Sequence, residues 1–156
     1  MSSADIKKLK QLRDETEVSF SLIKKALEET DNDIAKAKKK LQDWWAEKVT
    51  KVAGRSTSQG GIYSYIHHDG KTAGLVELLC ETDFVSGNSD FKSFGREIAM
   101  QVASFNPKNP EELLKQEYIR DSSKTIEDLL KEAVLKFGEN IKISRILRWK
   151  LNDWSL

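Results

Sequence analysis

Histidine and cysteine are the side chains that most often carry nucleophilic or metal chemistry, and this chain of 156 residues has 2 histidines and 1 cysteine. His67 and His68 are neighbours in a run that is typical of a β-strand. Because adjacent strand residues point to opposite faces, we expect the two imidazoles not to bind one metal ion. Cys80 ends an apolar run, which favours a buried structural thiol over a nucleophile. These residues predict no catalytic group, no metal site and no bound cofactor, so we do not expect an enzyme.

Thr82-Asp83-Phe84-Val85 is the remaining stretch whose residue types indicate a function. A polar pair and a large aromatic side chain stand just after an apolar strand and before the start of the next predicted helix. Phe84 either closes the end of the hydrophobic core or projects as a wedge into a groove of a partner. An aromatic anchor beside a polar residue is typical of an interface hot spot. The residue types alone leave both interpretations open.

Three short helices are predicted in residues 1–52, which we expect to form one domain. Ser2 or Ser3 is expected to cap the first helix, and the segment from Asp31 to Asp33 offers cap oxygens to the third. Helical spacing predicts the inward-facing side chains Ile6, Leu9, Leu12, Leu22, Ile23, Ala26, Leu27, Ile34, Ala37 and Leu41.

Residues 53–61 are small, polar and glycine-rich, and we interpret them as a linker to a second domain, residues 62–156. A hairpin is predicted from Ile62 to Cys80 with Asp69-Gly70 as its turn. Its second strand is apolar on both faces, which predicts a central strand covered on both sides. Helices are expected at residues 90–104, 111–119 and 126–137, followed by a last strand at residues 141–151. The predicted fold class is therefore α+β, with a three-helix module followed by a small antiparallel sheet packed with helices.

Charge argues against a polyanion as the partner. The 26 basic residues nearly balance the 25 acidic ones, which leaves a net charge of +1. Binding to nucleic acid by counterion release normally requires a large basic excess, so we expect no direct nucleic-acid partner. The run from Lys36 to Lys40 is the exception. On a helix its lysines spread over the solvent side, which favours a solvated face over a binding site for RNA.

No apolar run of about 18 residues is present, so we expect no membrane span. The first residues lack the apolar run of a signal peptide, and a single cysteine indicates a reducing compartment. We therefore expect a cytoplasmic protein, or else a mature chain after processing.

Three blocks of sequence resemble the elongation factor Ts family. Residues 12–16 (Leu-Arg-Asp-Glu-Thr) and 24–27 (Lys-Lys-Ala-Leu) are similar to its N-terminal signature. Residues 76–85 (Val-Glu-Leu-Leu-Cys-Glu-Thr-Asp-Phe-Val) resemble its most diagnostic stretch. Residues 123–126 and 137–141 resemble its closing helix and strand. The blocks occur in the family's order and span nearly the whole chain.

The resemblance implies a guanine-nucleotide exchange factor for elongation factor Tu. The first domain would be a ubiquitin-associated-like module that docks on the nucleotide-binding domain of elongation factor Tu, in its GDP-bound and nucleotide-free forms. Asp83 and Phe84 would be the pair that intrudes near the Mg²⁺ and phosphate site, so that GDP leaves faster. The residues implied to contact elongation factor Tu are Arg13, Phe20, Lys24, Thr82, Asp83, Phe84 and Val85.

Two departures from the family pattern affect this interpretation. Residues 16–21 read Thr-Glu-Val-Ser-Phe-Ser where the family has Thr-Gly-Ala-Gly-Met-Met, so Phe20 would replace an apolar contact. Only residues 106–122 separate the middle helix from the last one, which is too short for the second subdomain and helical hairpin of longer members. The missing half of the core suggests a homodimer. The tail with Trp154 matches no family pattern, and this side chain packs either on a partner or on the sheet.

Exchange activity has two alternatives. A binding module of the same fold could lack exchange activity and act as a sequestering partner or an adaptor. The position of Phe84 separates these hypotheses, since exchange requires it on an exposed turn. The other alternative is RNA or ribosome contact through the Lys36 to Lys40 face, which salt-insensitive binding would exclude.

Overall fold

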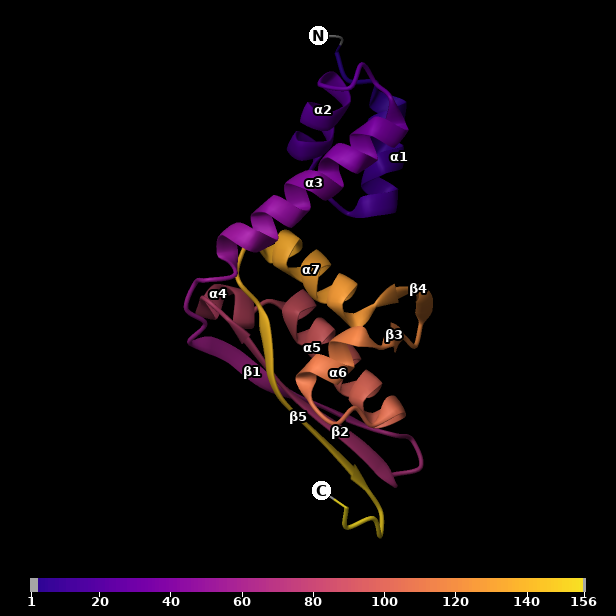
Figure 1. Ribbon diagram of the computed structural model, residues 1–156, viewed down its shortest axis with the longest axis vertical. Helices are drawn as coiled ribbons and strands as arrows, with labels where there is room; N and C mark the ends of the chain where they lie inside the picture. Colours follow the sequence, from indigo (N-terminus) through magenta and orange to yellow (C-terminus); the bar gives the residue numbers. More distant parts are fainter. Residues whose placement is uncertain (1–2, 156) are drawn as a thin grey trace. The chain divides into compact units, whose positions relative to one another are not determined.

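The computed structural model describes residues 3–155 (Figure 1). Its chain falls into two compact units, with the division between Val52 and Ala53. None of the helices in the described residues combines the length and apolar character needed to cross a membrane.

The first unit consists of three helices, α1 (Ile6–Thr16), α2 (Phe20–Glu28) and α3 (Ile34–Val52). Helical spacing places one apolar side of each helix in a shared core. Its buried residues are Leu12, Val18, Ile23, Ala26, Leu27, Ala37 and Leu41. The predicted inward-facing side chains are wrong at Ile6 of α1, which is 71% exposed, and at Leu22 of α2, which is 37% exposed.

Asp5 caps α1 by accepting hydrogen bonds from the backbone nitrogens of Lys7 and Lys8. This corrects the expected serine cap: Ser3 precedes the capping position, and Ser2 lies outside the described residues. Asp33 caps α3 as expected, since its Oδ1 accepts the backbone N–H of Lys36 at 3.0 Å.

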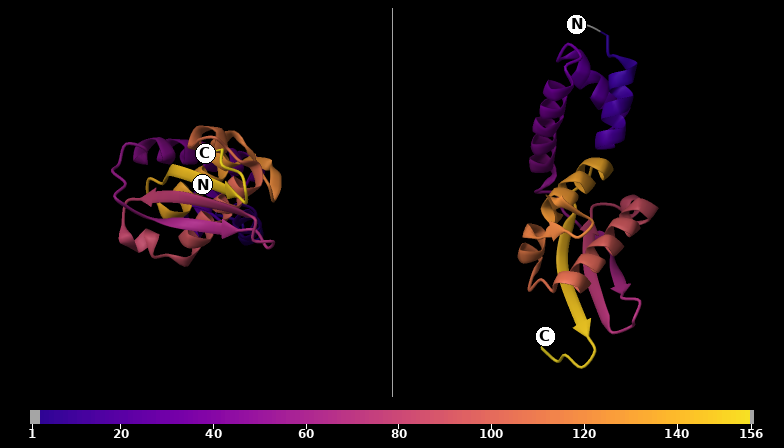
Figure 2. Two further views of the ribbon diagram at one scale, coloured as in Figure 1. Left: turned by 90° about the horizontal axis from the view of Figure 1, so that it is seen from below. Right: turned by 90° about the vertical axis from the view of Figure 1, so that its right-hand side faces the viewer.

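The second unit has a three-stranded antiparallel sheet in the order β1-β2-β5, whose strands lie side by side in Figure 2 (left). The strands are β1 (Gln59–Ile66), β2 (Thr72–Cys80) and β5 (Lys142–Lys150). The predicted central place of the Thr72–Cys80 strand is confirmed. β1 begins at Gln59, so the last three residues of the predicted linker belong to this strand.

Helices cover one face of this sheet (Figure 1). They are α4 (Asp83–Ser86), α5 (Ser89–Phe105), α6 (Pro110–Lys115) and α7 (Ile126–Phe137). α5 lies so close to β2 that a Cβ atom on Gly74 would come within 2.2 Å of the carbonyl oxygen of Ala99. The expected α+β fold class is thereby confirmed.

Residues 111–119 do not form the single predicted helix. α6 ends at Lys115, and a two-stranded sheet follows from β3 (Glu117–Tyr118) and β4 (Asp121–Thr125). The hairpin is attached to α5, because the Tyr118 hydroxyl donates to Glu97 Oε2 at 2.7 Å and Gln101 bonds the backbone of Glu117 and Ile119. Such tertiary contacts are absent from the local hydrophobic pattern that predicted a helix.

The prediction that β2 is covered on both faces is wrong for the described unit. Val76, Leu78 and Cys80 are buried on the helix side, whereas Leu75 faces the other way and is only half-buried. The strand register places further large apolar side chains beside Leu75 on that outer face. Its exposed members are Ile62 (66%), Ile66 (66%), Leu147 (36%) and Trp149 (60%). We call Ile62, Ile66, Leu75, Leu147 and Trp149 the outer sheet face.

Candidate functional site

The stretch from Thr82 to Val85 forms a sharp turn at the end of β2. Thr82 has extended backbone angles and caps α4, with its Oγ1 accepting the backbone N–H of Val85 at 3.4 Å. Asp83 and Phe84 follow on the first turn of α4, and both are exposed. The Phe84 side chain has 87% of its surface exposed, which excludes the interpretation that it closes the core of this unit.

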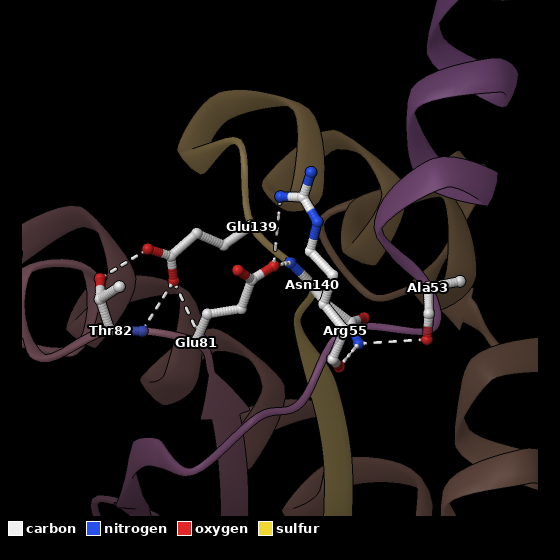
Figure 3. A network of polar contacts seen from close by, with 6 residues as sticks. All are labelled: Ala53, Arg55, Glu81, Thr82, Glu139 and Asn140. Carbon is white, nitrogen blue, oxygen red and sulfur yellow. Dashed lines mark hydrogen bonds and ion pairs between the residues drawn. The ribbon is translucent and has the colours of Figure 1, made fainter.

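A network of polar contacts holds the base of this turn (Figure 3). Glu139, in the loop between α7 and β5, accepts three hydrogen bonds from residues 81 and 82. Its Oε2 accepts the backbone N–H groups of Glu81 at 3.0 Å and Thr82 at 3.1 Å. Its Oε1 accepts the Thr82 hydroxyl at 2.5 Å. The carboxylate of a residue that is distant in the sequence therefore holds the exposed turn.

Asn140 extends the network to the start of the second unit. Its backbone N–H donates to Glu81 Oε1 at 2.7 Å. Its side-chain amide donates to the carbonyl oxygens of Ala53 at 3.2 Å and Arg55 at 2.7 Å. The Arg55 guanidinium also lies 3.7 Å from Glu81 Oε1. Asn140 is only 4% exposed, so the amide contacts replace the water that its side chain loses.

Cys80 lies at the foot of the turn and is fully buried. Burial raises the pKa of its thiol, and the negative charge of Glu139 raises this pKa further. Its Sγ–H donates to the carbonyl oxygen of Thr82 at 3.2 Å. A thiol with a raised pKa is a poor nucleophile, which agrees with the structural role expected from the sequence.

The two histidines lie in the hairpin turn beyond β1, and the prediction that they point to opposite faces is wrong. Their ring centroids are 4.2 Å apart, because His67 and His68 follow the end of the strand. His67 Nδ1 is 3.0 Å from the Tyr65 hydroxyl. Within residues 3–155, no group of three or more histidine, cysteine or acidic residues is placed to hold a metal ion.

The first unit brings two of its three predicted contact residues together. The guanidinium carbon of Arg13 lies 5.2 Å from the centroid of the Phe20 ring, and the Arg13 side chain also donates to the carbonyl oxygens of Glu17 and Val18. Phe20 is 54% exposed. Lys24 lies one turn further along α2 on the same side and pairs with Glu28 at 3.8 Å. The Phe20 ring, with one cation over it, therefore remains open to solvent.

The lysine run on α3 is largely paired with acidic side chains of its own unit. Lys36 pairs with Asp33, Lys38 with Glu15, and Lys40 with Glu29. Ala37 and Leu41 are buried as expected. Pairing reduces the positive charge available to a phosphate backbone, which favours the solvated face over an RNA site.

Sequence reasoning identified the turn but missed the residues that hold it. Glu81, Glu139 and Asn140 were recognised only as part of a family pattern, without a structural role. A local indication exists, since Gly138 ends α7 with a φ of 72° and two polar residues follow it before Ile141 and the start of β5. Polar residues in a short connection between a helix and a strand of the same unit are candidates for an internal network.

The family model described as Elongation factor TS matches residues 81–155, a segment that begins at the base of the turn. The elongation factor Ts of Coprothermobacter proteolyticus is 39% identical over 190 aligned positions, which cover 93% of this chain and 96% of that protein. That of Leptospira biflexa is 36% identical over 188 positions, with coverages of 92% and 95%. That of Aquifex aeolicus is 39% identical over 159 positions, which cover 99% of this chain and 54% of that protein.

The alignments with the first two relatives have 190 and 188 positions, whereas this chain has 156 residues. Both relatives therefore contain residues that have no counterpart here.

Proposed function

Because the chain belongs to the elongation factor Ts family, a family of translation elongation factors, we propose that it binds elongation factor Tu and accelerates the release of GDP. The observation that carries this proposal is the exposure of Phe84, 87%, on a turn held by a partly buried network of hydrogen bonds. Because the hydrogen bonds fix the backbone of the turn, the segment that carries the ring loses little further backbone freedom when Phe84 enters a partner's groove. Asp83 beside it supplies a charged group at the same tip.

The proposed action requires no covalent chemistry. GDP is held in its site by oriented backbone amides and by Mg²⁺ at the phosphates. A wedge at Asp83 and Phe84 that displaces those groups removes favourable contacts with the phosphates. If nucleotide-free elongation factor Tu binds this chain more tightly than the GDP form does, GDP and the chain weaken each other's binding by the same factor.

The first unit supports the proposal as a docking module. The guanidinium of Arg13 lies over the exposed Phe20 ring, and Lys24 follows one helical turn after Phe20 on α2. We assign residues 1–52 to this ubiquitin-associated-like domain and residues 62–156 to the domain that carries the wedge. The paired lysines of α3 lie outside this contact set.

A variant with Phe84→Ala tests the proposal directly. Elongation factor Tu loaded with a fluorescent GDP analogue is mixed with the natural protein or the variant, and the release rate is measured at saturation. We expect the natural protein to accelerate release and the variant to lose about tenfold or more of the maximal rate, as for other aromatic hot spots. The variant's thermal unfolding should be unchanged, because Phe84 is exposed.

Phe105→Ala is the matched control, since this phenylalanine is 51% exposed at the end of α5, away from the turn. It should release GDP at the natural rate. If the natural protein binds elongation factor Tu without accelerating release, the non-exchanging module becomes the better description.

Self-association is a second element of the proposal. The outer sheet face presents four large exposed apolar side chains of the described unit, more than isolated surface residues explain. The elongation factor Ts proteins of Coprothermobacter proteolyticus and Leptospira biflexa contain residues that have no counterpart in this chain. We infer that two copies pack their outer sheet faces together.

A further inference from the structure

The chain leaves the sheet directly before the wedge, and this departure creates a local problem for the backbone. The paired register of β2 ends at Cys80, so the N–H groups of Glu81 and Thr82 have no strand partner. Partly buried N–H groups need an acceptor. The single Oε2 atom of Glu139 accepts both, at 3.0 and 3.1 Å. The direction in which the backbone leaves β2 is thus fixed by one carboxylate oxygen.

The other oxygen of Glu139 controls the cap of α4. The Thr82 hydroxyl has one hydrogen, and it donates this hydrogen to Oε1 at 2.5 Å. Its lone pairs then remain for the backbone N–H of Val85, at 3.4 Å. α4 has only four residues and is far too short to be stable by itself. The orientation of Asp83 and Phe84 therefore depends on how Glu139 holds Thr82.

Glu139 is itself held by a reciprocal contact. While its carboxylate accepts the backbone of Glu81, the carboxylate of Glu81 accepts the backbone N–H of Asn140 at 2.7 Å. Asn140 is buried and bound to the carbonyl oxygens of Ala53 and Arg55. Figure 3 shows this series of contacts. These contacts hold the loop that carries Glu139 against the base of the turn.

We propose that Glu139 is a positioning residue for nucleotide exchange, which sets the orientation of the Asp83-Phe84 wedge through Thr82. The inference rests on the proposed exchange function and adds a residue outside the wedge itself. A residue that contacts elongation factor Tu directly would change both the maximal rate of GDP release and the half-saturating concentration, whereas a positioning residue changes only the maximal rate. Loss of Glu139 lowers the maximal rate of GDP release, while the concentration needed for half-saturation stays nearly constant because docking through the first unit is retained.

Two substitutions at this position give a graded test. In Glu139→Ala all three hydrogen bonds are lost, and we expect the maximal rate to fall about tenfold. In Glu139→Gln the shape is kept but the bonds are no longer charge-assisted, so we expect a fall of about threefold. The half-saturating concentration of elongation factor Tu with bound GDP analogue should change by less than about twofold in both.

Hydrogen exchange of the backbone amides provides a measurement that needs no partner. The amides of Glu81, Thr82 and Val85 should exchange faster in Glu139→Ala than in the natural protein, because their acceptors are lost or released. Glu127→Ala is the matched control. Glu127 lies on α7 with its carboxylate 3.7 Å from Lys131, and its loss should alter neither exchange of these amides nor GDP release.

The outcomes distinguish this inference from the proposed function. If the natural protein does not accelerate GDP release, the proposed function fails. If it does, and a folded Glu139→Ala variant matches its rate or protects the three amides equally well, the positioning role is refuted. Should Glu139→Ala fail to fold, Thr82→Val removes only the hydroxyl contacts and is expected to slow release about threefold. A Thr82→Val variant with the natural rate would refute the role as well.

Discussion

Phe84 and Phe20 are both exposed aromatic side chains, but different contacts hold them. Phe84 is carried by a turn whose backbone is bound to Glu139, and its ring projects freely. Phe20 is the first residue of α2, and the guanidinium of Arg13 lies over its ring at 5.2 Å. A cation over an aromatic face restricts the ring without burying it. The two rings are thus suited to different steps, insertion for Phe84 and docking for Phe20.

Phe20→Ala should therefore weaken binding without slowing the exchange step. We expect the half-saturating concentration of elongation factor Tu to rise about fivefold to tenfold, with the maximal rate of GDP release nearly unchanged. Saturation curves of the release rate measure both quantities. Ile6→Ala, another exposed apolar residue of the first unit, serves as control. A lower maximal rate with unchanged half-saturation would contradict the docking role.

At the scale of elements, the β3–β4 hairpin depends on one carboxylate of α5. Glu97 accepts the Tyr118 hydroxyl at 2.7 Å and the Arg120 Nε–H at 2.7 Å. Burial, followed by the bond to the Glu97 carboxylate, raises the pKa of Tyr118 to about 12. The hairpin has few ladder bonds of its own, so these side-chain contacts are a large part of what attaches it.

Tyr118→Phe gives a prediction with a defined pH dependence. The folded-state pKa of Tyr118 is raised, so its contribution is fully present below the ordinary value of 10.0 and is lost as the pH rises towards about 12. Near neutral pH we expect the variant to be less stable by about 1 kcal/mol. This difference should shrink between pH 10 and pH 12, measured as free energies of urea unfolding.

Other titratable groups, such as Tyr63, whose pKa burial raises, are present in both proteins and cancel in the difference. A difference that stays constant from pH 9 to pH 12 would show that the hydroxyl makes no such bond.

The elements that could be predicted are those that local residues determine. The helix predicted at residues 126–137 is confirmed as α7 with the same bounds, which the capping box of Thr125 and Asp128 and the C-terminal Gly138 determine locally. The β3–β4 hairpin could not be predicted, because Gln101 and Glu97 on another element hold it. Local propensity gives no information on such contacts.

The same distinction applies to the candidate site. The Thr82 to Val85 stretch stood out through its own composition, but the exposure of Phe84 required the structure. Glu139 lies 57 residues beyond Thr82 in the chain, and no periodic pattern relates the two. The local turn was therefore predictable and its support was not.

At the scale of the whole molecule, the outer sheet face has no covering element among the described residues of the second unit. Arg145 and Glu77 lie on the same side of the sheet, where Arg145 Nη2 is 2.7 Å from Glu77 Oε2, and this ion pair neutralises both charges. Lys142, which pairs with Leu79, is a further charged residue on this side, at the opposite end of β5 from Trp149. The apolar side chains of the outer sheet face themselves carry no charge that repels a second copy. Antiparallel sheets commonly bury such faces by packing against another sheet.

We expect the natural protein to sediment as a dimer of its 17.8 kDa chain and Trp149→Glu to sediment as a monomer. A charge at this position would be buried without a partner in the dimer, which weakens association by about a hundredfold or more. Trp149 is 60% exposed in the single chain, so the variant should keep its fold and its thermal unfolding. Ile119→Glu, on the turn of the β3–β4 hairpin and 46% exposed, introduces the same charge elsewhere and should remain dimeric. A natural protein that is still monomeric at about 100 μM would contradict self-association through this face.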